Sequence, residues 1–319
     1  MTRPLISITV SVRDGVQWID DCMKAICAQT YRPLEIIAID DGSTDGGTNI
    51  LQAWHDPDGK RAASNGIPVR VLTQEPFGLS AGRNNALNAA KGKWVAITDI
   101  DCRPRPDWIE RMFASSKGVE AVTGRVIFDE GRTSVSRLRA RNIAWKYSSR
   151  SENATLANGP CSMFKGEGLI SRGGFDPSWY HAEDMEVSMK LLQSGGAIRF
   201  EPEAVVDHVA EESLTLFLGK RRRDARAHTR IMRNYSGVKH DFTHDGTRVV
   251  LILLLYVTLI ATIGIFPDPL IPAIVLILGG FVFRNYLLWS AALWLGAIEG
   301  CIDALLGRNG HQPLFRKPA

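Results

Sequence analysis

Short apolar segments alternate with amphipathic ones along the first hundred residues of the chain. The apolar runs are rich in β-branched residues and predict buried strands at 5–12, 34–39, 69–72 and 94–98. Apolar residues at helical spacing predict intervening helices near 16–28 and 81–90. Strands that alternate with helices in this way are typical of a mostly parallel, doubly wound α/β sheet.

The next hundred residues follow a less regular pattern. It predicts a helix near 108–115, a strand near 119–127 and a helix near 183–192. A strand-like run ends at His208, and we expect a glycine-rich loop at 158–168. This part of the chain therefore extends the same domain with mixed elements.

The last seventy residues are strongly apolar. Val249–Phe266 holds 18 residues without a charge, about the minimum for a bilayer core of about 30 Å. Pro267-Asp268-Pro269 predicts a tight turn, and a second apolar run of 14 residues ends at Arg284. The segment after Arg284 either completes a membrane-spanning hairpin or lies along the membrane interface as an amphipathic helix.

The change in composition predicts four regions. They are an α/β domain at 1–215, a basic juxtamembrane segment at 216–248, the apolar region at 249–306 and a basic tail at 307–319. Arg248 precedes the first span, and Arg316 and Lys317 lie in the tail, so the positive-inside rule predicts that both ends of the hairpin are cytosolic.

Charge and cysteine content narrow the class of protein. The net charge is only +4 over 319 residues, and no long basic stripe is present, which argues against a nucleic-acid partner. The five cysteines form no CxxC pair and no metal-binding spacing, as expected in a reducing compartment. No apolar signal region follows the N-terminus, so we expect the α/β domain in the cytosol.

Two carboxylate pairs follow predicted strands. Asp40 and Asp41 come after the second strand, and Asp99 and Asp101 come after the fourth. Ligands of doubly wound sheets bind outside the carboxyl ends of the strands. Carboxylate oxygens suit Mg²⁺ or Mn²⁺, and a bound divalent cation neutralises phosphate charge. The pattern predicts a metal-dependent site for a phosphate-bearing ligand.

These motifs resemble those of the family 2 glycosyltransferases, which have the GT-A fold. The resemblance covers residues 5–210, about two thirds of the chain. The segments that carry it are Gln29-Thr30-Tyr31, Glu35-Ile36-Ile37, Asp40-Asp41-Gly42-Ser43-Thr44-Asp45, Gly78-Leu79-Ser80-Ala81-Gly82-Arg83-Asn84, Ala96-Ile97-Thr98-Asp99-Ile100-Asp101, Gly173-Gly174-Phe175-Asp176 and Glu183-Asp184.

The resemblance implies a role for each carboxylate. Asp40 and Asp41 would hold the base and ribose of a nucleotide-sugar donor. Asp99 and Asp101 would bind the metal and diphosphate, with Asp101 as the direct ligand. Asp184 would be the catalytic base that deprotonates the acceptor hydroxyl, in a single displacement that inverts the sugar's configuration.

Other residues of the predicted donor site are open to two interpretations. His208 would contact the metal or a phosphate, or serve a structural role. Arg83, and with it Glu183 of the last motif, would border the nucleotide-sugar, although packing would also explain Arg83. Arg223 and Arg226 resemble a diphosphate clamp, because a guanidinium binds phosphate in a bidentate manner, but they also fit a lipid-facing basic patch.

The chain departs from the family pattern at two places. The first strand is followed by Arg13-Asp14 where the family has Tyr-Asn, which leaves the identity of the base open. The Gln-x-x-Arg-Trp motif of the processive members is absent, and the apolar segments are too few for a polymer channel. The sequence therefore favours a non-processive enzyme.

The sequence as a whole predicts a membrane-anchored glycosyltransferase on the cytosolic face of the plasma membrane. We expect a UDP-sugar donor, or else a GDP- or dTDP-sugar, and an acceptor linked to a membrane lipid. A nucleotidyltransferase is an alternative, but the glycine-rich phosphate loop expected after its first strand is missing. A non-catalytic membrane scaffold is another, and the intact Asp99, Asp101 and Asp184 argue against it.

Overall fold

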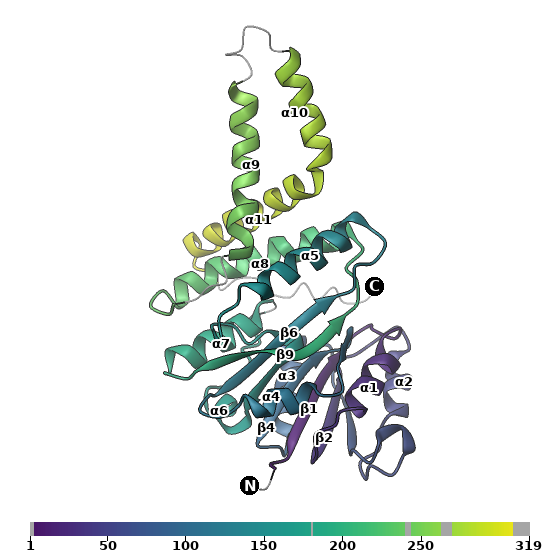
Figure 1. The fold of residues 1–319 in the computed structure, drawn as a ribbon. Helices are drawn as coiled ribbons and strands as arrows, with labels where there is room; N and C mark the ends of the chain where they lie inside the picture. The colour runs from purple at the N-terminus through teal and green to yellow at the C-terminus, as the bar shows by residue number, and fades with distance from the viewer. Residues whose placement is uncertain (1–2, 180, 240–243, 263–269, 309–319) are drawn as a thin grey trace.

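A computed structural model describes residues 3–179, 181–239, 244–262 and 270–308. Figure 1 shows an α/β body at the base, a layer of helices above it, and two helices that extend away from that layer. The predicted turn at 267–269 and the part of the basic tail from residue 309 onwards lie outside the described residues.

The first half of the sheet is parallel, as the sequence predicts. Its strands lie in the order β3, β2, β1, β4. Their bounds are Ile6–Val12 for β1, Leu34–Asp40 for β2, Val69–Thr73 for β3 and Trp94–Asp99 for β4. Every residue of β2 is buried, which explains its continuous apolar run. The connecting helices are α1 (Ile19–Cys27), α2 (Gly47–Ala53) and α3 (Leu79–Ala89).

The second half of the sheet is mixed. The order continues from β4 through β8 (Ser162–Lys165), β6 (Ala121–Phe128), β9 (Ile198–His208) and β5 (Cys102–Pro104). Strand β8 is antiparallel to both β4 and β6, whereas β6 and β9 are parallel. A short strand, β7 (Asn153–Ala154), pairs with β9. The α4 helix (Trp108–Ala114) and the α7 helix (Glu183–Gln193) agree with the predicted ones.

The prediction of a single glycine-rich loop at 158–168 is wrong. A short 3₁₀ turn (Gly159–Cys161), strand β8 and the start of helix α6 (Gly166–Ser171) occupy this segment. The strand lies between the glycines of this segment, and its side chains Met163 and Phe164 are buried in the core. Sequence reasoning also missed α5 (Ser134–Ser148), a polar helix that begins with a capping box at Thr133.

Helices α8 and α11 form the layer above the body. They run over Leu214–Asn234 and Arg284–Leu305. Two glycines of α11 allow a close approach, because a Cβ at Gly296 would lie 2.0 Å from the carbonyl oxygen of Arg222. Asp303 of α11 binds Arg226 of α8, with oxygen–nitrogen distances of 2.6 and 2.9 Å. The α11 helix is thus fastened lengthwise to α8.

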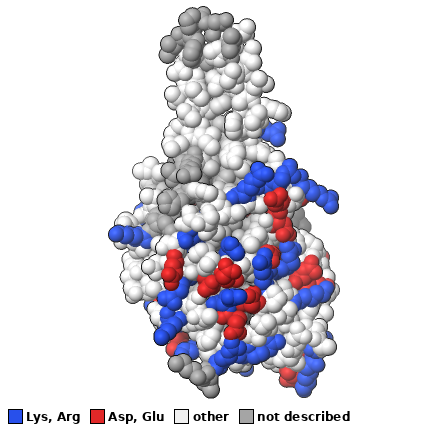
Figure 2. All heavy atoms as spheres, in the orientation of Figure 1, with Lys and Arg blue, Asp and Glu red and all other residues white. Residues whose placement is uncertain are grey.

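Helices α9 (His244–Thr262) and α10 (Leu270–Val282) extend beyond this layer and contact each other through Tyr256, whose hydroxyl donates to the carbonyl of Leu276. Their surface is apolar, with side chains such as Leu255, Val275 and Leu278 about two-thirds exposed. Figure 2 shows this end of the molecule almost free of charged side chains on the visible face.

Only α11, among the described helices, is both long and apolar enough to cross a membrane, and a third of its most apolar window is buried inside the protein. The described apolar parts of α9 and α10, Val249–Thr262 and Pro272–Val282, are shorter than that limit.

Candidate active site

The predicted carboxylates lie together at the carboxyl edge of the parallel strands. In the sheet register Val12 of β1 pairs with Asp40 of β2, and Ser11 pairs with Asp99 of β4. The two carboxylates therefore flank the end of β1, about 10 Å apart at the backbone from the usual strand spacing. This places the predicted nucleotide and metal residues on one edge of the sheet.

Asp40 and Asp41 are both buried and satisfied by donors of the protein itself. Asp40 accepts hydrogen bonds from the Ser43 amide and the Thr48 hydroxyl, at 3.1 and 2.6 Å. Asp41 accepts from the Gln74 side chain and the Gly78 amide, at 2.7 and 3.0 Å. Burial raises the pKa of Asp41. The two carboxylates thus order the loops that follow β2 and β3 at this edge of the sheet.

Arg83 joins three elements at the centre of the site. Its guanidinium, on α3, donates to Asp99 at 2.9 Å and to Glu183 of α7 at 2.6 Å, and its side chain is 3% exposed. Burial by itself lowers the pKa of Arg83, but Glu183 and Asp99 outweigh it and raise the pKa. Burial raises the pKa of Glu183, against the attraction of Arg83. The arginine thus fixes α3, β4 and α7 relative to one another.

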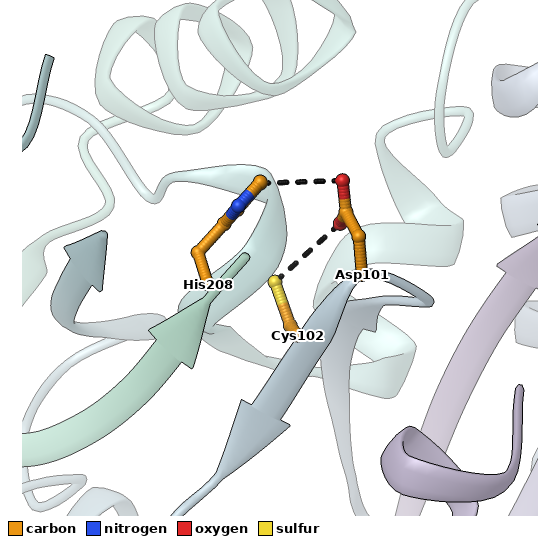
Figure 3. Close-up of side chains that lie close together, drawn as sticks. All are labelled: Asp101, Cys102 and His208. Atoms are coloured by element: carbon orange, nitrogen blue, oxygen red, sulfur yellow. Dashed lines mark hydrogen bonds and ion pairs between the residues drawn. The ribbon is translucent and has the colours of Figure 1, made fainter. Parts of the chain in front are cut away.

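Asp101 and His208 meet because β5 and β9 pair side by side. Cys102 is registered with His208, so the preceding Asp101 faces the histidine ring (Figure 3). An Asp101 carboxylate oxygen lies 3.4 Å from Nε2 of His208, and the Cys102 thiol lies 3.7 Å from the other oxygen. The contact between Asp101 and His208 joins residues that lie 107 positions apart in the sequence.

The hydrogen bonding of His208 suits a metal ligand. Its Nδ1 lies 2.7 Å from the carbonyl oxygen of Val209, which can only accept, so Nδ1 carries the proton. In the neutral ring Nε2 then presents a lone pair toward the Asp101 carboxylate. A divalent cation between these two acceptors would satisfy both, and a carbonyl that orients the imidazole in this way is the usual support of a ligating histidine.

Cys102 is a poor third ligand, although its sulfur lies within 4.8 Å of the other two donor atoms. Burial raises the pKa of the Cys102 thiol well above its usual value, and Asp101 and Asp99 raise it further. Mg²⁺ and Mn²⁺ are hard cations, which prefer carboxylate oxygen to sulfur as a ligand. We assign the pair Asp101 and His208 as the candidate metal ligands.

Asp184 lies in the first turn of α7, beside the 3₁₀ turn that follows Asn158. One oxygen accepts a hydrogen bond from the Gly159 amide at 2.9 Å, and the other accepts from the Met185 amide at 2.8 Å. Its side chain is half-buried. The helix begins after Ala182, which has the left-handed φ of +63°.

Gly159 lies against both Asp184 and Arg83. A Cβ at Gly159 would lie 2.7 Å from a terminal nitrogen of Arg83, so only glycine fits without movement. This residue was not among the predicted site residues. The glycine-rich segment was the available signal.

Arg223 and Arg226 lie on α8, on the side that contacts α11. Both line a pocket between α8, α11 and the loop around Trp179, and Asp303 of α11 holds the Arg226 guanidinium. The structure therefore groups these two arginines with α11.

Two further residues near the site were missed. Burial raises the pKa of Asp101, and His208 and Lys220 of α8 oppose this change, which places a lysine near the candidate metal ligands. His181 precedes Glu183 and pairs with Asp224 of α8. Neither stands out in the sequence, because Lys220 belongs to a run of basic residues and His181 is isolated.

This sheet and its strand-end carboxylates define a GT-A nucleotide-sugar transferase fold. The family model of glycosyl transferase family 2 matches residues 7–171, and that of glycosyl transferase family group 2 matches residues 94–298. The chain belongs to glycosyl transferase family 2, and its expected fold and family are confirmed.

Two relatives and one solved structure illustrate the match. The chain is 25% identical over 217 residues to glycosyltransferase AglE of Haloferax volcanii, which covers 66% of this chain and 68% of that protein. It is 33% identical over 123 residues to glycosyltransferase GlyG of Streptococcus pneumoniae, covering 38% of this chain and 38% of that protein. The chain thus spans well under half the length of GlyG.

The solved structure is the mannosyltransferase PcManGT of Pyrobaculum calidifontis in complex with GDP-Man and Mn²⁺. The match has a TM-score of 0.69 at 20% identity and covers 96% of this chain and 88% of that one. At this identity it shows a shared fold, which includes the C-terminal helices described here.

Proposed function

We propose that this glycosyltransferase is a metal-dependent, inverting enzyme that moves one sugar from a nucleotide-sugar to a lipid-linked acceptor. The single observation that carries the proposal is the arrangement of Asp101 and His208, two acceptors 3.4 Å apart at the edge that holds Asp99. The Mn²⁺ and GDP-Man of the mannosyltransferase with the same fold support a metal and a nucleotide-sugar at this edge.

A divalent cation would be held by Asp101 and His208, with Asp99 beside them. When bound, such an ion neutralises the charge that develops on the leaving diphosphate. Asp99 is turned toward Arg83 at 2.9 Å, so its second oxygen remains to face a metal-bound or diphosphate group. The buried Asp40 and Asp41 shape the loops that would surround the nucleoside.

Asp184 would accept the proton of the acceptor hydroxyl. Backbone amides of Gly159 and Met185 hold its two oxygens, so the carboxylate is fixed in one orientation. Each oxygen keeps a second lone pair, and one of these can receive the proton as the hydroxyl attacks the sugar. A single attack from the face opposite the leaving diphosphate inverts the configuration.

The membrane would bring enzyme and acceptor together. We propose that α9 and α10 enter the bilayer from the cytosolic side and that α11 lies along its surface, fastened to α8 by Arg226 and Asp303. The exposed apolar side chains of α9 and α10 support this arrangement. A shared membrane raises the effective concentration of a lipid-linked acceptor, such as a polyprenyl phosphate or a polyprenyl-diphosphate glycan.

Substitution Asp184→Asn tests the role of the base. Asn is nearly isosteric and still accepts the Gly159 amide with its carbonyl oxygen, but it cannot take a proton. We expect the transfer rate to fall at least about a hundredfold, the usual contribution of a general base, while nucleotide binding persists. Transfer is measured with a panel of UDP-, GDP- and dTDP-sugars and Mn²⁺, and Asp58→Asn, an exposed carboxylate on the body, is the control.

Several outcomes would contradict the proposal. Full activity of Asp184→Asn would show that Asp184 is not the catalytic base. A product that retains the donor's configuration would rule out a single displacement. Release of pyrophosphate from a nucleoside triphosphate would identify a nucleotidyltransferase instead. If no nucleotide-sugar bound at all, a non-catalytic scaffold would be the better description.

A further inference from the structure

A basic pocket lies between α8, α11 and the loop that precedes α7. Its lining includes Trp179, His181 and Gly300. Five arginines line it, against one carboxylate, that of Asp303. The arginines are Arg223, Arg226, Arg230, Arg233 and Arg308.

Asp303, the carboxylate among the described lining residues, already has a charged partner. Asp303 forms a bidentate pair with Arg226, so it does not neutralise the other four arginines. The Nε atoms of Arg223 and Arg230 are buried and have no hydrogen-bond partner among the described residues. Arg230 stacks over the Trp179 ring at 3.8 Å and donates to Ser178, which fixes its position.

The surroundings of Arg230 disfavour its positive charge. Burial lowers its pKa, and the neighbouring Arg233 lowers it further, although Asp176 and Glu186 oppose the change. Burying cations near one another is unfavourable unless an anion compensates them. Several guanidinium groups around one cavity match the oxygens of a phosphate, which they bind in a bidentate manner.

Apolar helices lie beside the helices that line the pocket. Helix α9 contacts α11, and its side chains Leu255 and Leu259 are 62% and 44% exposed. Helices α8 and α11, which line the pocket, lie between the α/β body and the apolar helices α9 and α10 (Figure 1). A ligand with a phosphate and a hydrocarbon chain would satisfy both the arginines and these apolar helices.

The pocket also borders the catalytic segment. His181 lines it and is followed by Ala182, Glu183 and Asp184, the proposed base. The backbone carbonyl of Trp179, another lining residue, accepts a hydrogen bond from Ser80 of α3 at 3.1 Å. A phosphate in the pocket would therefore lie against the loop that leads into α7, the helix that carries Asp184.

We propose that the α8–α11 pocket binds the phosphate of a membrane-embedded amphiphile, the lipid-linked acceptor of the sugar. This inference rests on the proposed function, because it specifies which chemical group of the acceptor the enzyme recognises. It assigns Arg223, together with Arg230 and Arg233, to the acceptor phosphate in place of the donor diphosphate suggested by the sequence, whereas Asp303 holds Arg226.

Binding of farnesyl phosphate to the detergent-solubilised full chain tests the proposal, with farnesol and inorganic phosphate as comparison ligands. We expect farnesyl phosphate to raise the melting temperature in a saturable way, and neither comparison ligand to do so at the same concentration. In Arg230→Gln/Arg233→Gln the half-saturating concentration should rise at least about tenfold, the loss expected when charge-assisted hydrogen bonds are removed.

Two further variants keep the test decisive. Arg233→Gln alone changes an exposed side chain that makes a long hydrogen bond to Asn234, so it should fold normally and still weaken binding. Arg137→Gln is the matched control, because it removes an exposed arginine of α5 that donates to the backbone carbonyl of Arg132. We expect it to bind farnesyl phosphate as the wild type does.

Three results would overturn the inference. They are equal binding by the wild type and the double variant, an equal loss in Arg137→Gln, and stabilisation by inorganic phosphate that matches that by farnesyl phosphate. The last would indicate a site for free phosphate. If sugar transfer occurs but these variants bind normally, the pocket assignment alone fails. If they behave as expected and no nucleotide-sugar is used, the proposed function fails alone.

Discussion

At the scale of single residues, the candidate metal site depends on protonation. The carbonyl of Val209 fixes the proton of His208 on Nδ1, at 2.7 Å, and leaves Nε2 free to ligate. The neighbouring Cys102 offers a sulfur atom, which hard cations such as Mg²⁺ and Mn²⁺ bind less readily than oxygen. Cys102 and His208, which pair in the register of β5 and β9, thus differ in how well they can serve as metal ligands.

This difference predicts unequal effects of two substitutions. His208→Ala should weaken Mn²⁺ binding in the presence of UDP at least about tenfold, because it removes a ligand. Cys102→Ala should change the affinity less than twofold, since a hard cation gains little from a sulfur ligand. Titration calorimetry measures both. A large loss in Cys102→Ala would show that the sulfur is a ligand.

Arg83 is the residue whose loss should cost most stability. Arg83→Met would leave Glu183, whose side chain is 7% exposed, buried without its partner. Removal of one member of a buried ion pair costs about 3–5 kcal/mol. We expect a fall of several degrees in the melting temperature, measured on the detergent-solubilised chain.

A double substitution separates this charge effect from a loss of packing. Arg83→Met/Glu183→Gln should recover part of the lost stability, because the neutral amide needs no counterion. No recovery in the double variant would show that packing around Arg83, and not the ion pair, dominates.

At the scale of elements, an ion pair connects α8 to the segment just before α7, the helix that carries the proposed base Asp184. His181, one residue before the α7 cap, pairs with Asp224, which also binds Arg221 at 2.9 Å. Burial lowers the pKa of His181, but Asp224 outweighs it, and the net pKa is raised above the ordinary value of 6.5. Glu183 raises it and Arg223 lowers it. Folding thus favours the protonated form of His181 relative to the unfolded chain.

This pair should make stability depend on pH. Because the folded pKa is raised, the contribution is fully present below about pH 6.5 and is lost as the pH rises through the folded value. The melting temperature of the wild type should therefore exceed that of His181→Gln by more at pH 6 than at pH 9. An equal difference at both pH values would contradict a charged pair.

At the scale of the whole molecule, charge and apolar surface are separated. Charged side chains cover the α/β body, and the exposed apolar side chains gather on α9, α10 and α11 (Figure 2). A soluble protein rarely exposes so large an apolar patch. The segregation fits a protein that works at a membrane surface.

Charges placed on α9 and α10 should therefore release the protein from membranes. Leu255→Lys/Leu278→Lys puts a cation on each helix, at a cost of about 2.5–3.5 kcal/mol for each at the centre of a bilayer. We expect less protein in the membrane fraction after extraction with alkaline carbonate. The matched control, Phe77→Lys/Ile170→Lys, changes two equally exposed apolar residues of the body and should stay with the membrane. Equal retention of both variants would argue against insertion of α9 and α10.

The strands of the parallel half, and the carboxylates at their ends, could be read from the sequence. Burial of β1, β2 and β4 on both faces imposes apolar, β-branched runs that are visible locally. Polar residues that follow such runs, as Asp40 and Asp99 do, must lie at one edge. Strand β8 escaped prediction because it is only four residues long and is bordered by glycines.

Which side chains meet was decided only by the tertiary structure. Asp101 reaches His208 through the register of β5 and β9, and Arg83 reaches Glu183 across 100 residues. The basic run on α8 became a pocket because α11 packs along it. The local pattern of a chain records how deeply each segment is buried, whereas pairing between distant segments depends on how the whole sheet and its helices assemble.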